Sequence, residues 1–194
     1  MPETELPPGR ERITASRRIY EGRILKLRED TVLLPSGVEA RREIVEHAPV
    51  VAIVPLDDQN RVLMVRQFRL PAQDVLLEIP AGAVDPGEAV EAAAQRELRE
   101  ETGYRAQHLR KIAGFYVSPG YVTEFIHVFL ATGLSHDPQE ADADEDIVVQ
   151  PVPLTEAVPM VESGQVRDAK SIVGILLAAR ALDATANPLF EPKL

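Results

Sequence analysis

An uninterrupted apolar run at residues 50–54 restricts the fold more than any other feature of this sequence. Successive side chains of a strand point to opposite faces of its sheet, so five apolar residues in a row predict a strand covered on both faces. Residues 57–60 are turn-forming, and residues 61–65 return as a second strand that is apolar after Arg61. We therefore expect a hairpin at residues 50–65 inside a layered domain.

Helices are expected on either side of that sheet. The clearest one covers residues 88–102, with Asp85-Pro86-Gly87 before it and Gly103 placed as its C-terminal cap. Glu88 and Glu91 suit the positive end of the helix dipole. Further strands are expected at 125–130 and 147–152, and further helices at 155–163 and 168–182. This order predicts a single α/β or α+β sandwich.

The first part of the chain has a different composition. Residues 1–46 contain nine basic and nine acidic residues, so the net charge of −10 falls entirely on residues 47–194. From residue 15 to 46, β-branched and apolar residues alternate with charges, and Pro35-Ser36-Gly37 supplies a turn. We expect an antiparallel β arm at 1–46, preceding a main domain at 47–194.

Composition excludes several classes of protein. The acidic balance argues against nucleic acid as a partner, and zero cysteines exclude disulfides and thiolate chemistry. No apolar run approaches the ~18 residues of a membrane span. The N-terminus lacks the basic-then-apolar order of a signal peptide. A cytoplasmic protein without a membrane association is expected.

Three glutamates share one face of the central predicted helix. Glu97, Glu100 and Glu101 lie at i, i+3 and i+4, where like charges repel. One interpretation is a solvated acidic face relieved by Arg96 and Arg99. The other is a site for a hard divalent cation such as Mg²⁺, which prefers oxygen ligands. The face by itself leaves both open.

Residues at fixed intervals surround these glutamates. They are Gly82, Glu88, Arg96-Glu97-Leu98, Glu100-Glu101 and Gly103-Tyr104. This pattern resembles the Nudix box at every fixed position. The resemblance implies a Nudix-type α/β/α sandwich with a mixed sheet, and hydrolysis of nucleoside diphosphates linked to another moiety.

The same resemblance implies a metal site. Glu97 and Glu101 would be its main ligands, Glu100 an additional ligand with a catalytic role, and the backbone carbonyl of Ala81 a further ligand. The implied cofactor is Mg²⁺, or else Mn²⁺ or another divalent cation. Divalent cations neutralise a pyrophosphate and activate water, and a carboxylate can then take the proton of that water.

Outside the box, four segments resemble the ADP-ribose pyrophosphatase branch of the family. They are residues 66–69, 77–82, 118–120 and 164–170. By position, the substrate phosphates would be held by Arg69 and by Arg41 or Arg42, of which we favour Arg42. Glu78 would organise its loop. The remaining implied substrate contacts are Tyr20, Pro119, Gly120 and Glu124.

The segment from Asp137 to Asp146 has six acids in ten residues and no base. Composition predicts a flexible solvated loop, whereas relatives place the catalytic base there. Relatives often have two glutamates one residue apart, but Ala143 occupies one of those positions here. Glu145 therefore aligns best as the base, and Glu140 is the alternative.

Taken together, the resemblance predicts hydrolysis of ADP-ribose to AMP and ribose 5-phosphate by a homodimer whose arms reach the partner's active sites. One alternative is the same reaction on another nucleoside diphosphate sugar, such as GDP-mannose or a broad range of ADP-sugars. A second is a non-catalytic sensor that binds ADP-ribose.

Overall fold

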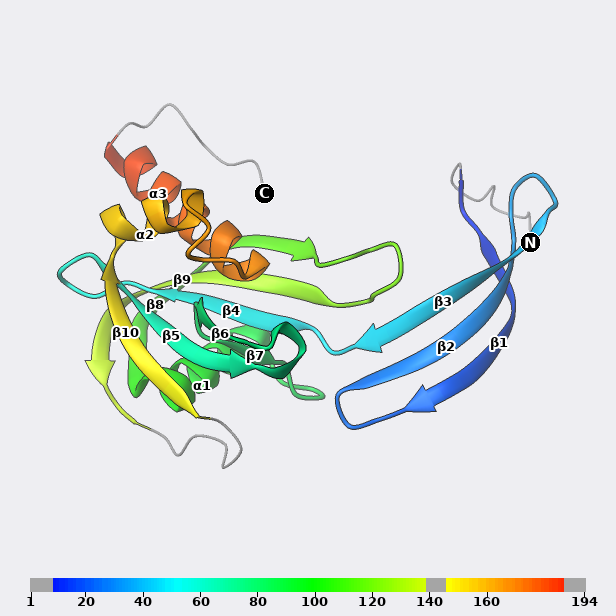
Figure 1. The fold of residues 1–194 in the computed structure, drawn as a ribbon, viewed down its shortest axis with the longest axis horizontal. Helices are drawn as coiled ribbons and strands as arrows, with labels where there is room; N and C mark the ends of the chain where they lie inside the picture. Colours follow the sequence, from blue (N-terminus) through cyan, green and yellow to red (C-terminus); the bar gives the residue numbers. More distant parts are fainter. Residues whose placement is uncertain (1–8, 139–145, 187–194) are drawn as a thin grey trace. The chain divides into compact units, whose positions relative to one another are not determined.

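The computed structural model describes residues 9–138 and 146–186, and the chain divides into two compact units (Figure 1). Unit 1 comprises Met1–Pro49 and Tyr116–Phe125, and unit 2 comprises Val50–Phe115 and Ile126–Leu194. No helix in the described ranges is long and apolar enough to cross a membrane.

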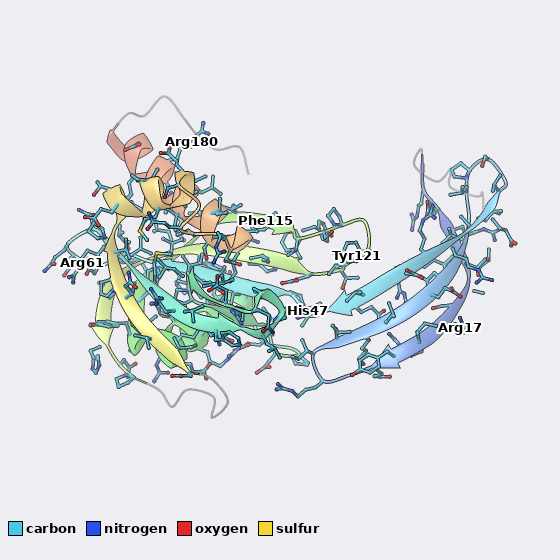
Figure 2. The ribbon with its side chains drawn as sticks, in the orientation of Figure 1. Arg17, His47, Arg61, Phe115, Tyr121 and Arg180 are labelled. Carbon is cyan, nitrogen blue, oxygen red and sulfur yellow. The ribbon has the colours of Figure 1, made fainter. Side chains whose placement is uncertain are left out.

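Unit 1 is built on a three-stranded antiparallel sheet, as predicted for the arm. Its strands are β1 (Arg12–Glu21), β2 (Leu25–Leu33) and β3 (Glu39–His47), in the order β1-β2-β3. The loop at 117–124 lies along the end of β3, where Val45 N–H donates to Tyr121 O (2.8 Å) and Thr123 N–H donates to Val45 O (3.0 Å). Tyr121 and His47 mark this end of the unit in Figure 2.

Unit 2 contains two sheets. The four-stranded sheet has the order β7-β4-β9-β8, and the three-stranded sheet has the order β10-β5-β6. The pairing of β4 with β9 is parallel and that of β4 with β7 is antiparallel, so the sheet is mixed. The bounds are β4 Val50–Pro55, β5 Arg61–Arg69, β6 Asp74–Glu78, β7 Ala81–Ala83, β8 Tyr104–Tyr116, β9 Phe125–His136 and β10 Ile147–Pro153.

The hairpin predicted at residues 50–65 is wrong. Both strands and the turn exist, with Asp57 N–H donating to Arg61 O (3.0 Å), but β4 and β5 belong to different sheets. They share one isolated bridge, between Leu56 and Val62. The reason is that β7 and β9 occupy the two edges of β4, and each is more distant in sequence than β5.

The complete burial of β4, which the apolar run predicted, comes from helices on both faces. On one face, Val51 and Ile53 pack with Ala94 and Leu98 of α1 (Val90–Thr102). On the other face, Val54 packs in the cluster that contains residues of α2 (Leu154–Glu162) and α3 (Ala169–Ala186). Figure 1 shows α1 and α3 on opposite sides of the strands. The predicted α/β/α sandwich is confirmed.

Helix α1 begins two residues later than predicted and ends as predicted. Glu88 lies in the turn before it, where its backbone N–H donates to Asp85 O (3.0 Å) and its carboxylate accepts from Asp85 N–H (3.1 Å). At the other end, Gly103 has φ 76° and its N–H donates to Arg99 O. A residue with a Cβ would be strained in this conformation.

Candidate active site

The first glycine of the 82–104 segment makes room for a carboxylate. A Cβ built on Gly82 would collide with the carboxylate of Glu97. Gly82 lies in β7 and is absent from the positive-φ residues, so space rather than backbone freedom requires glycine there. The spacing between the two residues therefore reflects a direct contact between β7 and α1.

Glu101, one helical turn after Glu97, contacts the same strand. Its Oε2 accepts a hydrogen bond from Ala81 N–H at 3.3 Å. The exposed fractions of Glu97 and Glu101 are 9% and 7%, so both carboxylates are largely withdrawn from solvent. The structure thus brings Ala81, Glu97 and Glu101 together.

Arg96 holds the acidic face together. Its Nη1 donates to Glu97 Oε1 (2.6 Å) and Glu100 Oε2 (3.0 Å), while Nε and Nη2 donate to the two oxygens of Glu88 (3.1 and 3.0 Å). Nη2 also donates to Ala83 O at 2.9 Å. The hydrogen bond from Arg96 is the largest cause that holds the pKa of Glu88 below its usual range.

The donor set of this face fits a hard divalent cation. Across the described ranges, no group of three or more His, Cys, Asp or Glu side chains is close enough to hold a metal ion. Arg96 pairs with both Glu97 and Glu100, while Glu97 lies against Gly82 and Glu101 accepts from Ala81 N–H. Mg²⁺ commonly uses one or two carboxylates and takes its other ligands from water and substrate phosphates. Two carboxylates are therefore sufficient.

The contact at Gly82 gives a first testable expectation. Gly82→Ala should lower kcat about tenfold or more, corresponding to ~1.4 kcal/mol, because the new Cβ forces Glu97 away from β7. Steady-state kinetics with saturating metal and substrate measures this effect. Ala83→Ser, one residue along the strand and exposed, is the matched control and should retain activity. Equal kcat values for the two variants would contradict the packing argument.

A second cluster of charges lies at the end of β6. Glu78, 2% exposed, accepts two hydrogen bonds from Arg69: Nε donates to Oε1 and Nη2 to Oε2, both at 2.9 Å. Lys170 Nζ also donates to Oε2. Burial opposes ionisation of Glu78, but the bonds from Arg69 and the charge of Lys170 outweigh it and lower the pKa of Glu78. These contacts of Glu78 with Arg69 and Lys170 support the prediction that Glu78 organises its loop.

Sequence reasoning assigned no role to the residues that complete this cluster. Asp168 Oδ2 accepts from Lys170 Nζ (2.9 Å), Ser171 N–H (3.0 Å) and Ser171 Oγ (2.6 Å). Ser171 Oγ is also the acceptor for Ile79 N–H at 2.8 Å. The start of α3 is thereby joined to the loop before β7. Only the resemblance of residues 164–170 to relatives pointed toward this region.

Glu78→Gln should lower the free energy of unfolding at pH 7 by about 3 kcal/mol, the low end for a broken buried ion pair, since Asp168 still partners Lys170. The pKa of Glu78 is lowered by folding. Its stabilisation is therefore fully present above the unfolded pKa of ~4.3 and is lost as the pH falls through the lower folded value. Urea unfolding at several pH values should show a constant difference from pH 7 to 5 that shrinks below pH 4. A deficit that persists unchanged at pH 3 would contradict this assignment.

Five of the predicted substrate-binding residues lie in unit 1. Arg42, Pro119 and Gly120 line one surface hollow of about 540 Å³ within that unit. Arg42 is paired there with Glu11, to which its Nε donates at 3.0 Å. Tyr20 is 57% exposed on β1. Glu124 accepts from Val117 N–H through its backbone carbonyl.

Both glutamates proposed as the base, Glu140 and Glu145, lie outside the described residues. The residue at the start of the acidic segment is described. Asp137 N–H donates to Gly103 O at 2.9 Å, and its carboxylate pairs with Arg99 of α1 at 3.2 Å. The acidic segment therefore starts beside the helix that carries Glu97 and Glu101.

Two known families match this chain. The family described as NUDIX domain matches residues 46–172, and the family described as nucleoside diphosphate sugar hydrolase N-terminal domain matches residues 11–45. A crystal structure of an ADP compounds hydrolase superimposes with a TM-score of 0.82 at 23% identity, covering 90% of this chain and 95% of that one. At that identity, the likeness shows the fold alone.

Curated relatives are more similar in sequence. An ADP-ribose pyrophosphatase of Bacillus subtilis is 44% identical over 85% of this chain and 90% of its own length. An ADP-ribose pyrophosphatase of Mycobacterium tuberculosis is 35% identical over 90% of this chain and 86% of its own. A GDP-mannose pyrophosphatase of Citrobacter koseri is 36% identical over 70% of this chain and 76% of its own.

Proposed function

The chain belongs to the Nudix hydrolase family, and from this we propose that it hydrolyses the pyrophosphate bond of ADP-ribose to give AMP and ribose 5-phosphate. The observation that carries the proposal is the placement of Glu97 and Glu101 against Ala81 and Gly82. The substrate is inferred from the relatives. The 44%-identical relative is an ADP-ribose pyrophosphatase, and its match to 85% of this chain includes residues of both units.

The protein's own groups would divide the work as follows. Glu97 and Glu101 would hold Mg²⁺ or Mn²⁺, which when bound neutralises the pyrophosphate and lowers the pKa of water. Arg69, already oriented by Glu78, would donate to a phosphate oxygen. Glu145 would accept the proton of the attacking water.

A substrate panel tests the proposal. ADP-ribose, GDP-mannose, ADP-glucose, diadenosine polyphosphates and dNTPs would each be incubated with Mg²⁺, with Mn²⁺ and with EDTA. ADP-ribose should give the highest kcat/KM, and EDTA should abolish turnover. Faster hydrolysis of GDP-mannose would favour the second candidate, which the 36%-identical relative supports. Binding of ADP-ribose without turnover of any compound would favour a sensor.

We also propose a homodimer in which residues 15–46 of the arm reach the active site of the partner. The support is the family match of residues 11–45 to a nucleoside diphosphate sugar hydrolase N-terminal domain, together with the exposed apolar side chains of the arm, Ile13, Ile19 and Tyr20. Sedimentation should give a dimer at micromolar concentration. Tyr20→Ala should raise KM more than it lowers kcat, because it removes uniform binding. A monomeric protein would refute the dimer.

A further inference from the structure

The buried charge cluster that includes Arg69 contains a second cation, Lys170. Lys170 is 9% exposed, and its Nζ contacts Glu78 and Asp168. Asp168 in turn accepts hydrogen bonds from Ser171 at the start of α3. Lys170 is therefore fixed to a helix end on one side and to the carboxylate that orients Arg69 on the other.

The carboxylate of Glu78 accepts hydrogen bonds from two cations. Oε1 accepts from Arg69 alone, whereas Oε2 accepts from both Arg69 and Lys170. The Arg69 side chain is 40% exposed, so it is the cluster member with access to a ligand in solution. Its Nε and Nη2 are bound to Glu78, and Nη1 has no hydrogen-bond partner among the residues that the structure describes. That nitrogen is therefore the one left to donate to an anion.

The charge balance shows what Lys170 contributes. Arg69 and Lys170 balance Glu78 and Asp168, so these four groups are formally neutral, and the charge of Glu101 also acts on Arg69. Without the charge of Lys170, the two carboxylates would face Arg69 alone. The cluster would then carry a net negative charge beside the guanidinium, which weakens its attraction for phosphate oxygens. Without the charge of Asp168, the net charge would be positive and the attraction stronger.

We propose that Lys170 is a positioning residue that keeps Arg69 available for the phosphates of the substrate by sharing the carboxylate of Glu78. The proposal rests on the proposed function, because it takes a nucleoside diphosphate sugar as the ligand of Arg69. It predicts that neutralising Lys170 raises KM and that neutralising Asp168 lowers it.

The test measures kcat and KM for ADP-ribose in variants of the full-length protein. Lys170→Met should raise KM about tenfold, the equivalent of a 1.4 kcal/mol coupling, with kcat changed less than about twofold. Lys170→Arg should restore most of the loss, because it keeps the charge. Asp168→Asn should lower KM, since Asn retains the capping oxygen for Ser171 but removes the competing charge.

A double-mutant cycle separates action through Arg69 from a general loss of positive charge. Lys170→Met should have little further effect in an Arg69→Met background. Additive effects on KM would overturn the proposal, as would a rise in KM for Asp168→Asn. Ile175→Val, a buried change on the same helix, controls for loss of stability and should leave KM unchanged. If Lys170→Met does not fold, the sign of the Asp168→Asn effect decides.

A failure of the proposed function would be seen in the substrate panel with the wild-type protein, independently of the Lys170 variants. If the wild-type protein hydrolyses another compound of the panel, the same variants are compared on that compound. If it hydrolyses none, calorimetric binding of ADP-ribose in EDTA replaces KM. The proposal is overturned in either case if Lys170→Met leaves affinity unchanged.

Discussion

Glu97→Gln and Glu101→Gln should each lower kcat for ADP-ribose by more than ~10²-fold, since even the outer partners of metal ligands are worth about 10–100-fold. Both side chains lie against β7, largely buried, and an amide is a weaker ligand for Mg²⁺ than a carboxylate. Initial rates over a wide range of Mg²⁺ concentration measure the loss. High Mg²⁺ should restore part of it.

Glu91→Gln is the matched control on the same helix, because Glu91 is exposed in the first turn and outside the predicted ligand set. It should retain full activity. The free energy of unfolding without metal should change little in any of the three variants, because Arg96 already offsets the repulsion on the acidic face. Near-normal turnover of both site variants would refute the metal site.

The second large effect is expected at Glu145. Glu145→Gln should lower kcat ~10²–10⁴-fold, as is typical for loss of a general base, while KM changes little. Asp137, eight residues earlier, is anchored to Gly103 and Arg99 at the end of α1. This anchor supports a role for the acidic segment near the glutamates of that helix.

Glu140→Gln is the comparison that identifies the base, because the two variants make the same chemical change in one segment. Saturating ADP-ribose and a pH profile of kcat are required, since loss of a base should also remove the acidic limb of the profile. If Glu145→Gln keeps more than about a tenth of wild-type kcat, far short of the ~10²-fold minimum for a base, Glu145 is not the base. A larger loss for Glu140→Gln would transfer the role to Glu140.

What could be predicted from sequence depended on how local each signal is. The face of Glu97 and Glu101 follows from helical spacing, and Gly103 follows from the need for a left-handed cap. The apolar run of β4 correctly required two covering layers. Its partners were not predictable in this way, because the parallel ladder to β9 pairs Val50 with Ile126, far along the chain.

For the candidate site, too, contacts between residues close in sequence were easier to predict than contacts between distant ones. Gly82 and Glu97 are both fixed positions of one motif that is 23 residues long. The hydrogen bonds from Lys170 to Glu78 and from Ile79 N–H to Ser171 Oγ each join residues 92 positions apart, and no spacing in the sequence predicts them. The start of α1 was misplaced for a related reason, since Glu88 is used by Arg96 on the following helix rather than as a helical residue.

Arg96 has a consequence for how the protein responds to its ionic surroundings. Its guanidinium is a built-in counterion for Glu97 and Glu100, so the helix that carries them can fold before any metal arrives. At the proposed metal site, a divalent cation would have to compete with this tethered charge, which would lower its apparent affinity. Occupancy of the proposed site would then follow the free concentration of the cation in solution.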